Sequence, residues 1–280
     1  MPQSSQGLQL QAAAELERRR RARPIPTAAE FGRTLGFEPD PWQERFLSSR
    51  APRILLNCSR QSGKSTTTGL LALHQAVFYP GSLVLLVSRS ERQAGELFRK
   101  TRDFMRQMAS PPVLIEDNKL SIEMASGSRI VSLPSSEETI RSFSSVALIL
   151  EDEASRVPDA LYRSIRPMLA VSHGRLVLMT TPFGKRGHFF EEWSSSRPWE
   201  RYEVPATECP RITAEFLAEE REALGEWWFA QEYLCQFGEN VDGMFTHDQI
   251  MDAHSDDVQP LFDGATTATS DGVIPLFGGG

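Results

Sequence analysis

Short apolar runs recur along the middle of the chain, and stretches with helical spacing lie between some of them. Each run is too short for a buried helix and too uniformly apolar for a strand with one face in water. Such runs are typical of parallel strands covered on both sides. The pattern therefore predicts a doubly wound α/β fold. The predicted strands cover 54–56, 83–87, 146–150 and 176–179, and the predicted helices cover 64–79, 91–108 and roughly 159–169.

An alternating segment interrupts this pattern. Apolar and polar residues alternate over 120–124, Ser126 and Gly127 supply a turn, and a second apolar run begins at Ile130. This alternation on either side of a turn predicts an antiparallel hairpin inserted between two strands of the main sheet.

The ends of the chain differ from its middle. Residues 1–29 are predicted to be a flexible basic arm, and 256–280 a poorly ordered acidic tail. Between them we expect a core over 30–204 and a helical segment over 205–255, in which Gly225 separates two helices. The arginine-rich run in the arm is either a solvated segment or a contact for nucleic-acid phosphates or an acidic partner.

The net charge of −7 arises from the C-terminal residues. Positions 242–280 hold seven Asp and no Lys, Arg or Glu, which leaves 30 basic and 30 acidic residues in 1–241. A neutral body can still present a basic face to a polyanion. The three cysteines lack metal-ligand spacing, which favours a reducing compartment. No signal peptide is visible, and no apolar run approaches the roughly 18 residues of a membrane span.

A phosphate-binding motif follows the first predicted strand. Residues 58–65 read Cys-Ser-Arg-Gln-Ser-Gly-Lys-Ser, with Cys58 where the usual pattern has Gly. Backbone N–H groups of such a loop cradle phosphates; Lys64 is expected to reach the β- and γ-phosphate oxygens, and the Ser65 hydroxyl to hold Mg²⁺. The sequence therefore predicts a site for a nucleoside triphosphate. The expected binding residues are Gln43, Ser59, Arg60, Gln61, Ser62, Gly63, Lys64, Ser65 and Thr66.

Carboxylates follow the predicted strand at 146–150. Open α/β sheets bind ligands beside the carboxyl ends of their strands, where Glu151, Asp152 and Glu153 would lie. Asp152 is expected to hold Mg²⁺ through water, and Glu153 to activate the attacking water as general base. The alternative is that these residues merely begin a surface loop; the phosphate loop upstream favours the functional interpretation.

Two further motifs have both a structural and a functional interpretation. Thr180, Thr181 and Pro182 end the strand at 176–179 and either sense the γ-phosphate or form an ordinary transition to a loop. Arg60 either stabilises transition-state charge within its own subunit or faces outward. Arg141 is a weaker candidate, since it would act on a neighbouring subunit's nucleotide.

The stretch before the phosphate loop offers contacts to a base. The Gln43 amide can both donate to and accept from an adenine edge. Trp42 or Phe37 would then pack on the adenine ring, although core packing is the simpler expectation for Trp42.

Taken in order, these motifs resemble the ATPase part of the large terminase, the DNA-packaging motor of tailed bacteriophages. The resemblance covers roughly residues 37–253. It rests on 42–43, on the phosphate loop 58–66, on 148–154 with 157–159, on 180–184 with 187–190, and on 228–237.

The resemblance implies an ASCE-type, RecA-like P-loop NTPase core with a helical lid after it. It implies Mg²⁺-dependent ATP hydrolysis by Lys64 and Glu153, coupled through Thr180–Pro182 to the movement of double-stranded DNA into a procapsid. Arg60 would be a sensor or finger, and Arg141 a finger acting in trans in a homo-oligomeric ring. The implied partners are the portal protein and the small terminase subunit, and the implied location is the host cytoplasm, transiently at the procapsid portal.

The resemblance ends near the C-terminus. Large terminases usually continue into a nuclease domain, whereas about 40 residues follow the expected lid here, so we expect no nuclease activity from this chain. The open alternatives are an ATP-binding module with little hydrolysis, a helicase-like P-loop ATPase and a small-molecule P-loop kinase. A helicase normally needs a second RecA-like domain, for which 280 residues leave no room.

Overall fold

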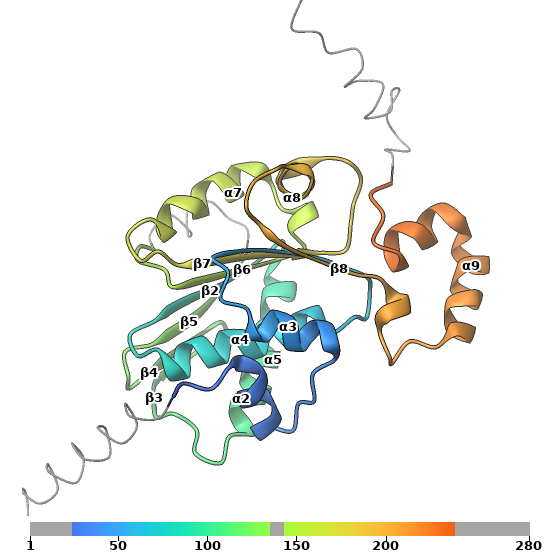
Figure 1. Ribbon diagram of the computed structural model, residues 1–280. Coiled ribbons are helices and arrows are strands. Elements are labelled where there is room, and N and C mark those ends of the chain that lie inside the picture. The colour runs from blue at the N-terminus through green and yellow to red at the C-terminus, as the bar shows by residue number, and fades with distance from the viewer. Residues whose placement is uncertain (1–23, 135–142, 239–280) are drawn as a thin grey trace, which may run out of the picture. The chain divides into compact units, whose positions relative to one another are not determined.

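The computed structural model describes residues 24–134 and 143–238, all within one compact unit. Their centre is a sheet of eight strands in the order β3-β4-β5-β2-β6-β7-β1-β8 (Figure 1). The strands are β1 (Arg53–Cys58), β2 (Leu83–Ser88), β3 (Leu114–Asp117), β4 (Ser121–Met124), β5 (Arg129–Pro134), β6 (Leu148–Asp152), β7 (Arg175–Thr180) and β8 (Glu200–Val204).

The sheet confirms the predicted fold class. The four apolar runs form β1, β2, β6 and β7, which pair in parallel with their neighbours, Asn57 lying opposite Thr180. The hairpin is also confirmed, since Ile122 faces Ile130 in the antiparallel pair β4–β5. Its second strand pairs in parallel with β2 as well, so the hairpin extends the main sheet.

Two strands, β3 and β8, were not predicted from the sequence. Both lie at sheet edges, with a paired neighbour on one side. In β8 only Tyr202 and Val204 are buried, and charged residues occupy Glu200, Arg201 and Glu203. An edge strand needs no continuous apolar run, so its pattern is weak.

Helices cover both faces of the sheet and enclose two apolar clusters (Figure 1). On one face lie α2 (Ala28–Thr34), α3 (Pro41–Ser48), α4 (Lys64–Phe78) and α5 (Glu91–Arg106); on the other lie α7 (Asp159–Ile165) and α8 (Gly187–Ser194). Successive strand residues point to opposite faces. Ile149 accordingly belongs to the α7–α8 cluster, whereas Leu148 and Leu150 belong to the other.

The predicted helices are found close to their expected bounds. The third ends earlier as an α-helix, because a 3₁₀ turn continues from Arg166 to Leu169, where Pro167 lacks a backbone N–H. Helix α9 (Ala214–Tyr233) contains a break at Gly225, whose φ of 76° and ψ of 163° are not helical. The two helices expected around Gly225 are therefore confirmed.

Several predictions fall outside the described residues: the basic arm over 1–23, Arg141, and the tail beyond 238. The domain boundaries at 29, 204 and 255 stay predictions. None of the helices in the described part of the chain is long and apolar enough to cross a membrane.

Candidate nucleotide site

The phosphate loop joins the buried end of β1 to the start of α4. Gly63 caps α4 with a φ of 91°, a left-handed conformation that favours glycine. A Cβ there would also lie 2.9 Å from the Gln43 amide nitrogen. Cys58 is fully buried, and burial raises the pKa of its thiol to about 12. At this position the side chain is therefore a small apolar group that packs under the loop.

The loop N–H groups divide into two sets. Those of Ser59 and Arg60 donate to the carbonyls of Val204 and Glu232, at 2.9 and 3.0 Å. Those at the start of α4, including Lys64, Ser65 and Thr66, precede the first residue with a helical acceptor, as at every helix N-terminus. An anion is therefore best accommodated at the start of α4.

Four side chains from three separated stretches meet at this helix end. The Lys64 ammonium donates to the Thr181 hydroxyl at 3.1 Å and lies 3.8 Å from a Glu153 carboxylate oxygen. The Ser65 hydroxyl donates to Asp152 at 3.3 Å. The phosphate loop, the carboxylates and the Thr motif thus lie together, as the sequence predicts.

The carboxylate environment suits a divalent cation. Burial raises the pKa of Asp152, while the nearby charge of Lys64 and the Glu153 N–H (2.9 Å) oppose this shift. A hydroxyl and a carboxylate oxygen are the hard donors that Mg²⁺ takes alongside water and phosphate. Ser65 and Asp152 therefore fit the predicted ion.

Glu153 has an uncommon backbone conformation. Its φ of 56° is left-handed, and it precedes the 3₁₀ turn Ala154–Arg156. A non-glycine residue pays roughly 1–2 kcal/mol for this conformation. The side chain is about a quarter exposed and lies beside Lys64, where a ligand and water can reach it.

The Thr motif connects β7 to the carboxylate loop. The Thr180 hydroxyl accepts from the Ser155 N–H at 3.3 Å and donates to the Thr181 carbonyl at 2.8 Å. Pro182 is buried, and the Phe183 ring lies between the guanidinium groups of Arg156 and Arg186, at 3.8 and 5.0 Å. The segment thus contacts the residues that follow Glu153.

Other predicted residues have partners that the sequence did not indicate. The Arg60 guanidinium pairs with Glu232 of α9. The Gln43 side chain accepts from the Asp40 N–H at 2.8 Å, in a capping box that starts α3. Trp42 is buried in the core, in agreement with the simpler expectation.

Two basic residues near the loop were missed. Arg211 donates to the Ser62 carbonyl at 3.3 Å and to Asp40 at 2.8 Å. Lys100 of α5 is half-buried; burial lowers its pKa, Asp152 opposes the shift, and Lys64 adds to it. Both are distant in sequence from the motifs, so no local pattern could have indicated them.

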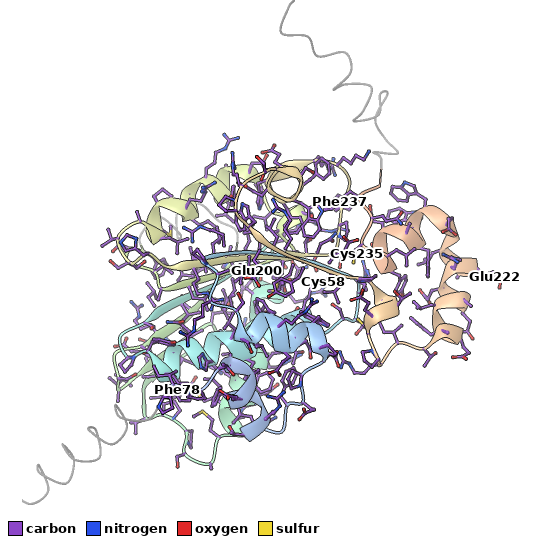
Figure 2. The ribbon with its side chains drawn as sticks, viewed as in Figure 1. Cys58, Phe78, Glu200, Glu222, Cys235 and Phe237 are labelled. Atoms are coloured by element: carbon purple, nitrogen blue, oxygen red, sulfur yellow. The ribbon has the colours of Figure 1, made fainter. Side chains whose placement is uncertain are left out.

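The segment after α9 returns to β1 and β8. The Asn57 amide donates to the Cys235 carbonyl at 2.8 Å, and the Cys235 thiol donates to the Val204 carbonyl at 3.2 Å. Cys58 pairs in register with Val204, so Cys58 and Cys235 lie on either side of it (Figure 2). These buried contacts hold the end of α9 against the strand that leads into the phosphate loop.

Comparisons with known proteins agree with this site. A family model described as the N-terminal part of the T4likevirus-type terminase large subunit matches residues 55–252. The structure resembles the large terminase ATPase domain of Thermus phage P74-26, with a TM-score of 0.64 and 19% identity, covering 77% of this chain and 100% of that one.

Longer terminases share the same fold. The large terminase of bacteriophage HK97 matches with a TM-score of 0.58 and 14% identity, over 72% of this chain and 51% of that one. A large terminase from a thermophilic bacteriophage, in complex with ADP, gives 0.58 and 10%, over 72% and 54%. This chain thus spans about half the length of those two proteins. Because the family model covers most of the chain, it belongs to the large terminase subunits, the motor proteins of viral DNA packaging.

Proposed function

We propose that this chain hydrolyses ATP with Mg²⁺ and that hydrolysis drives double-stranded DNA into a procapsid. The observation that carries the proposal is the meeting of Lys64, Ser65, Asp152 and Glu153 at the start of α4. The ADP complex of a structural relative supports the nucleotide.

Each residue has a defined role in this proposal. Lys64 binds the β- and γ-phosphates, with the α4 N-terminus and the N–H groups that precede it. Ser65 and Asp152 hold Mg²⁺, which neutralises charge on the β- and γ-phosphates when bound. Glu153 takes a proton from the water that attacks the γ-phosphorus, the bond to the bridging oxygen breaks, and ADP leaves with the electron pair.

The Thr motif is proposed to report the state of the phosphate. Thr181 contacts Lys64, and Thr180 contacts Ser155 in the carboxylate loop. Loss of the γ-phosphate would therefore change the partners of both threonines and pass to Pro182 and the residues beyond it. Gln43, whose amide lies beside Gly63, is proposed to contact the adenine edge.

The remaining roles concern assembly. Arg60 is proposed to act on the phosphate in cis, and Arg141 in trans across a ring of copies. DNA, the portal protein and the small terminase subunit are the proposed partners, in the host cytoplasm.

The test is steady-state ATP hydrolysis over a range of protein concentrations. Lys64→Ala should abolish nucleotide binding or turnover. Glu153→Gln should bind ATP but hydrolyse it about 10²–10⁴-fold more slowly, because an amide cannot accept the proton. Lys119→Ala, which removes an exposed lysine paired with Glu91, is the matched control.

The concentration series separates a motor from a binding module. A finger supplied in trans makes specific activity rise as subunits meet. Activity that stays near zero at every concentration, with ATP bound, would indicate a binding module. Wild-type turnover in Lys64→Ala would disprove the phosphate-loop assignment.

A further inference from the structure

A buried histidine lies between two carboxylates on the sheet face opposite the phosphate loop. His188 Nε2 lies 2.8 Å from the Glu151 carboxylate, and His188 Nδ1 lies 3.1 Å from Asp159. Glu151 is 0% exposed, and its second oxygen has no hydrogen-bond partner among the described residues. The charge of Glu151 therefore depends on His188.

The β6 backbone joins this pair to the proposed catalytic residues. Glu151 lies on the same face of β6 as Ile149, toward α7 and α8, whereas Asp152 lies on the face of Leu150, toward α4. The same strand end thus carries the His188 contact on one face and Asp152 on the other. Glu153 follows directly.

The histidine is fixed in place by its own surroundings. Its backbone N–H donates to Asp159 at 2.8 Å, at the start of α7. Its ring stacks on Tyr162, with centroids 4.4 Å apart and planes 10° apart. The Tyr162 hydroxyl donates in turn to the buried carboxylate of Glu192 at 2.7 Å. The His188 ring therefore has little freedom to turn away from Glu151.

His188 also ends the segment that begins with the Thr motif. This segment, residues 181–187, is anchored at one end by the Thr181–Lys64 contact and at the other by His188. Both anchors lead to the same site: the first to the phosphate loop, and the second through Glu151 to Asp152 and Glu153.

Stability alone does not account for a buried charged pair here. An imidazole that donates from both nitrogens is protonated, and burying charges costs free energy even when they are paired. Apolar residues of similar volume often stabilise a protein as well or better. A fixed distance between two chain segments is what the pair supplies and what apolar packing supplies less well.

We propose that His188 is a positioning residue that holds segment 181–187 in register with the carboxylate end of β6. The inference rests on the proposed ATP hydrolysis for its kinetic consequence. Without the link, Thr181 and Glu153 can shift relative to each other. Turnover then falls while nucleotide affinity, set mainly by the phosphate loop, changes little.

Two variants divide the contacts of the histidine. In His188→Gln the amide can reach Glu151, as Nε2 does; in His188→Asn it can reach Asp159, as Nδ1 does. Both are neutral and both lose the ring that stacks on Tyr162. We expect kcat of His188→Asn to lie at least about tenfold below that of His188→Gln, with KM for ATP within about twofold. The exposed His173→Asn is the control.

Equal kcat values in the two variants would overturn the proposal. If His188→Asn does not fold, the double variant Glu151→Leu, His188→Leu replaces the pair with apolar groups, and wild-type kcat in that variant would also overturn it. Hydrogen–deuterium exchange provides a readout without turnover: residues 181–187 should exchange faster in His188→Asn than in His188→Gln. If the wild type does not hydrolyse ATP but the exchange difference is found, the proposed function fails and the positioning role stands.

Discussion

Arg60 of the phosphate loop is bound to Glu232 of helix α9 through both side chain and backbone. The guanidinium pairs with the Glu232 carboxylate, and the Arg60 N–H donates to the Glu232 carbonyl at 3.0 Å. The Arg60 side chain is 60% exposed, whereas that of Glu232 is 9% exposed. The hydrogen bond to Glu232 raises the pKa of Arg60 despite burial. In this arrangement Glu232 competes with any phosphate for the guanidinium.

Removing that competitor should strengthen ATP binding. Glu232→Gln keeps the shape of the side chain but weakens its hold on Arg60. Partly exposed ion pairs contribute about 0.2–1 kcal/mol, so we expect ATP affinity to rise by roughly 1.5–5-fold. Arg60→Ala should weaken binding, and the double variant should show no gain from Glu232→Gln. A gain that persists in the double variant would show that Arg60 does not mediate it.

Asp152 and Glu153 are expected to respond differently to loss of charge. Asp152→Asn removes the carboxylate that Ser65 contacts, so the Mg²⁺ concentration for half-maximal activity should rise by about tenfold or more. Glu153→Gln should leave Mg²⁺-dependent nucleotide binding close to that of the wild type. Titrating Mg²⁺ at saturating ATP measures the first effect, and nucleotide binding measures the second. Equal loss of ATP affinity in both variants would contradict this division of roles.

The agreement between sequence and structure follows the physical reach of each pattern. Buried parallel strands are apolar along their whole length, so β1 and β6 could be predicted, and the motifs after them could be placed at one sheet edge. Edge strands such as β8 lack that pattern. The Arg60–Glu232 pair joins residues 172 positions apart, and no local spacing encodes it. His188 lies within a recognised motif, but its role depends on Glu151, which the sequence places beside Asp152 without indicating which face it occupies.

Stability should depend on pH through His188. Burial lowers the pKa of His188, but its hydrogen bonds and ion pairs with Glu151 and Asp159 outweigh burial and raise the pKa above 6.5. A raised folded-state pKa stabilises the fold fully below the unfolded pKa, and this contribution is lost as pH rises through the folded pKa. The difference in free energy of unfolding between wild type and His188→Gln should therefore be largest below about pH 6.5 and decrease above it. Urea unfolding at a series of pH values measures it, and a difference that grows with pH would contradict the assignment of charge.

Two glycines outside the proposed site should respond in opposite directions to alanine. A Cβ at Gly174, just before β7, would lie 2.1 Å from the Val146 carbonyl oxygen and 2.8 Å from a Leu169 methyl group. Backbone cannot move away as a flexible side chain can, so Gly174→Ala should destabilise the protein by about 1–3 kcal/mol or more. Gly95, inside α5, would place its Cβ 3.9 Å from Leu120, an ordinary contact. Gly95→Ala should therefore stabilise the protein by about 0.5–1 kcal/mol, since alanine loses less conformational entropy in a helix. Urea unfolding of both variants beside the wild type measures the two shifts. Wild-type stability in Gly174→Ala would mean that β6 and β7 do not approach as closely at that turn as the structure describes.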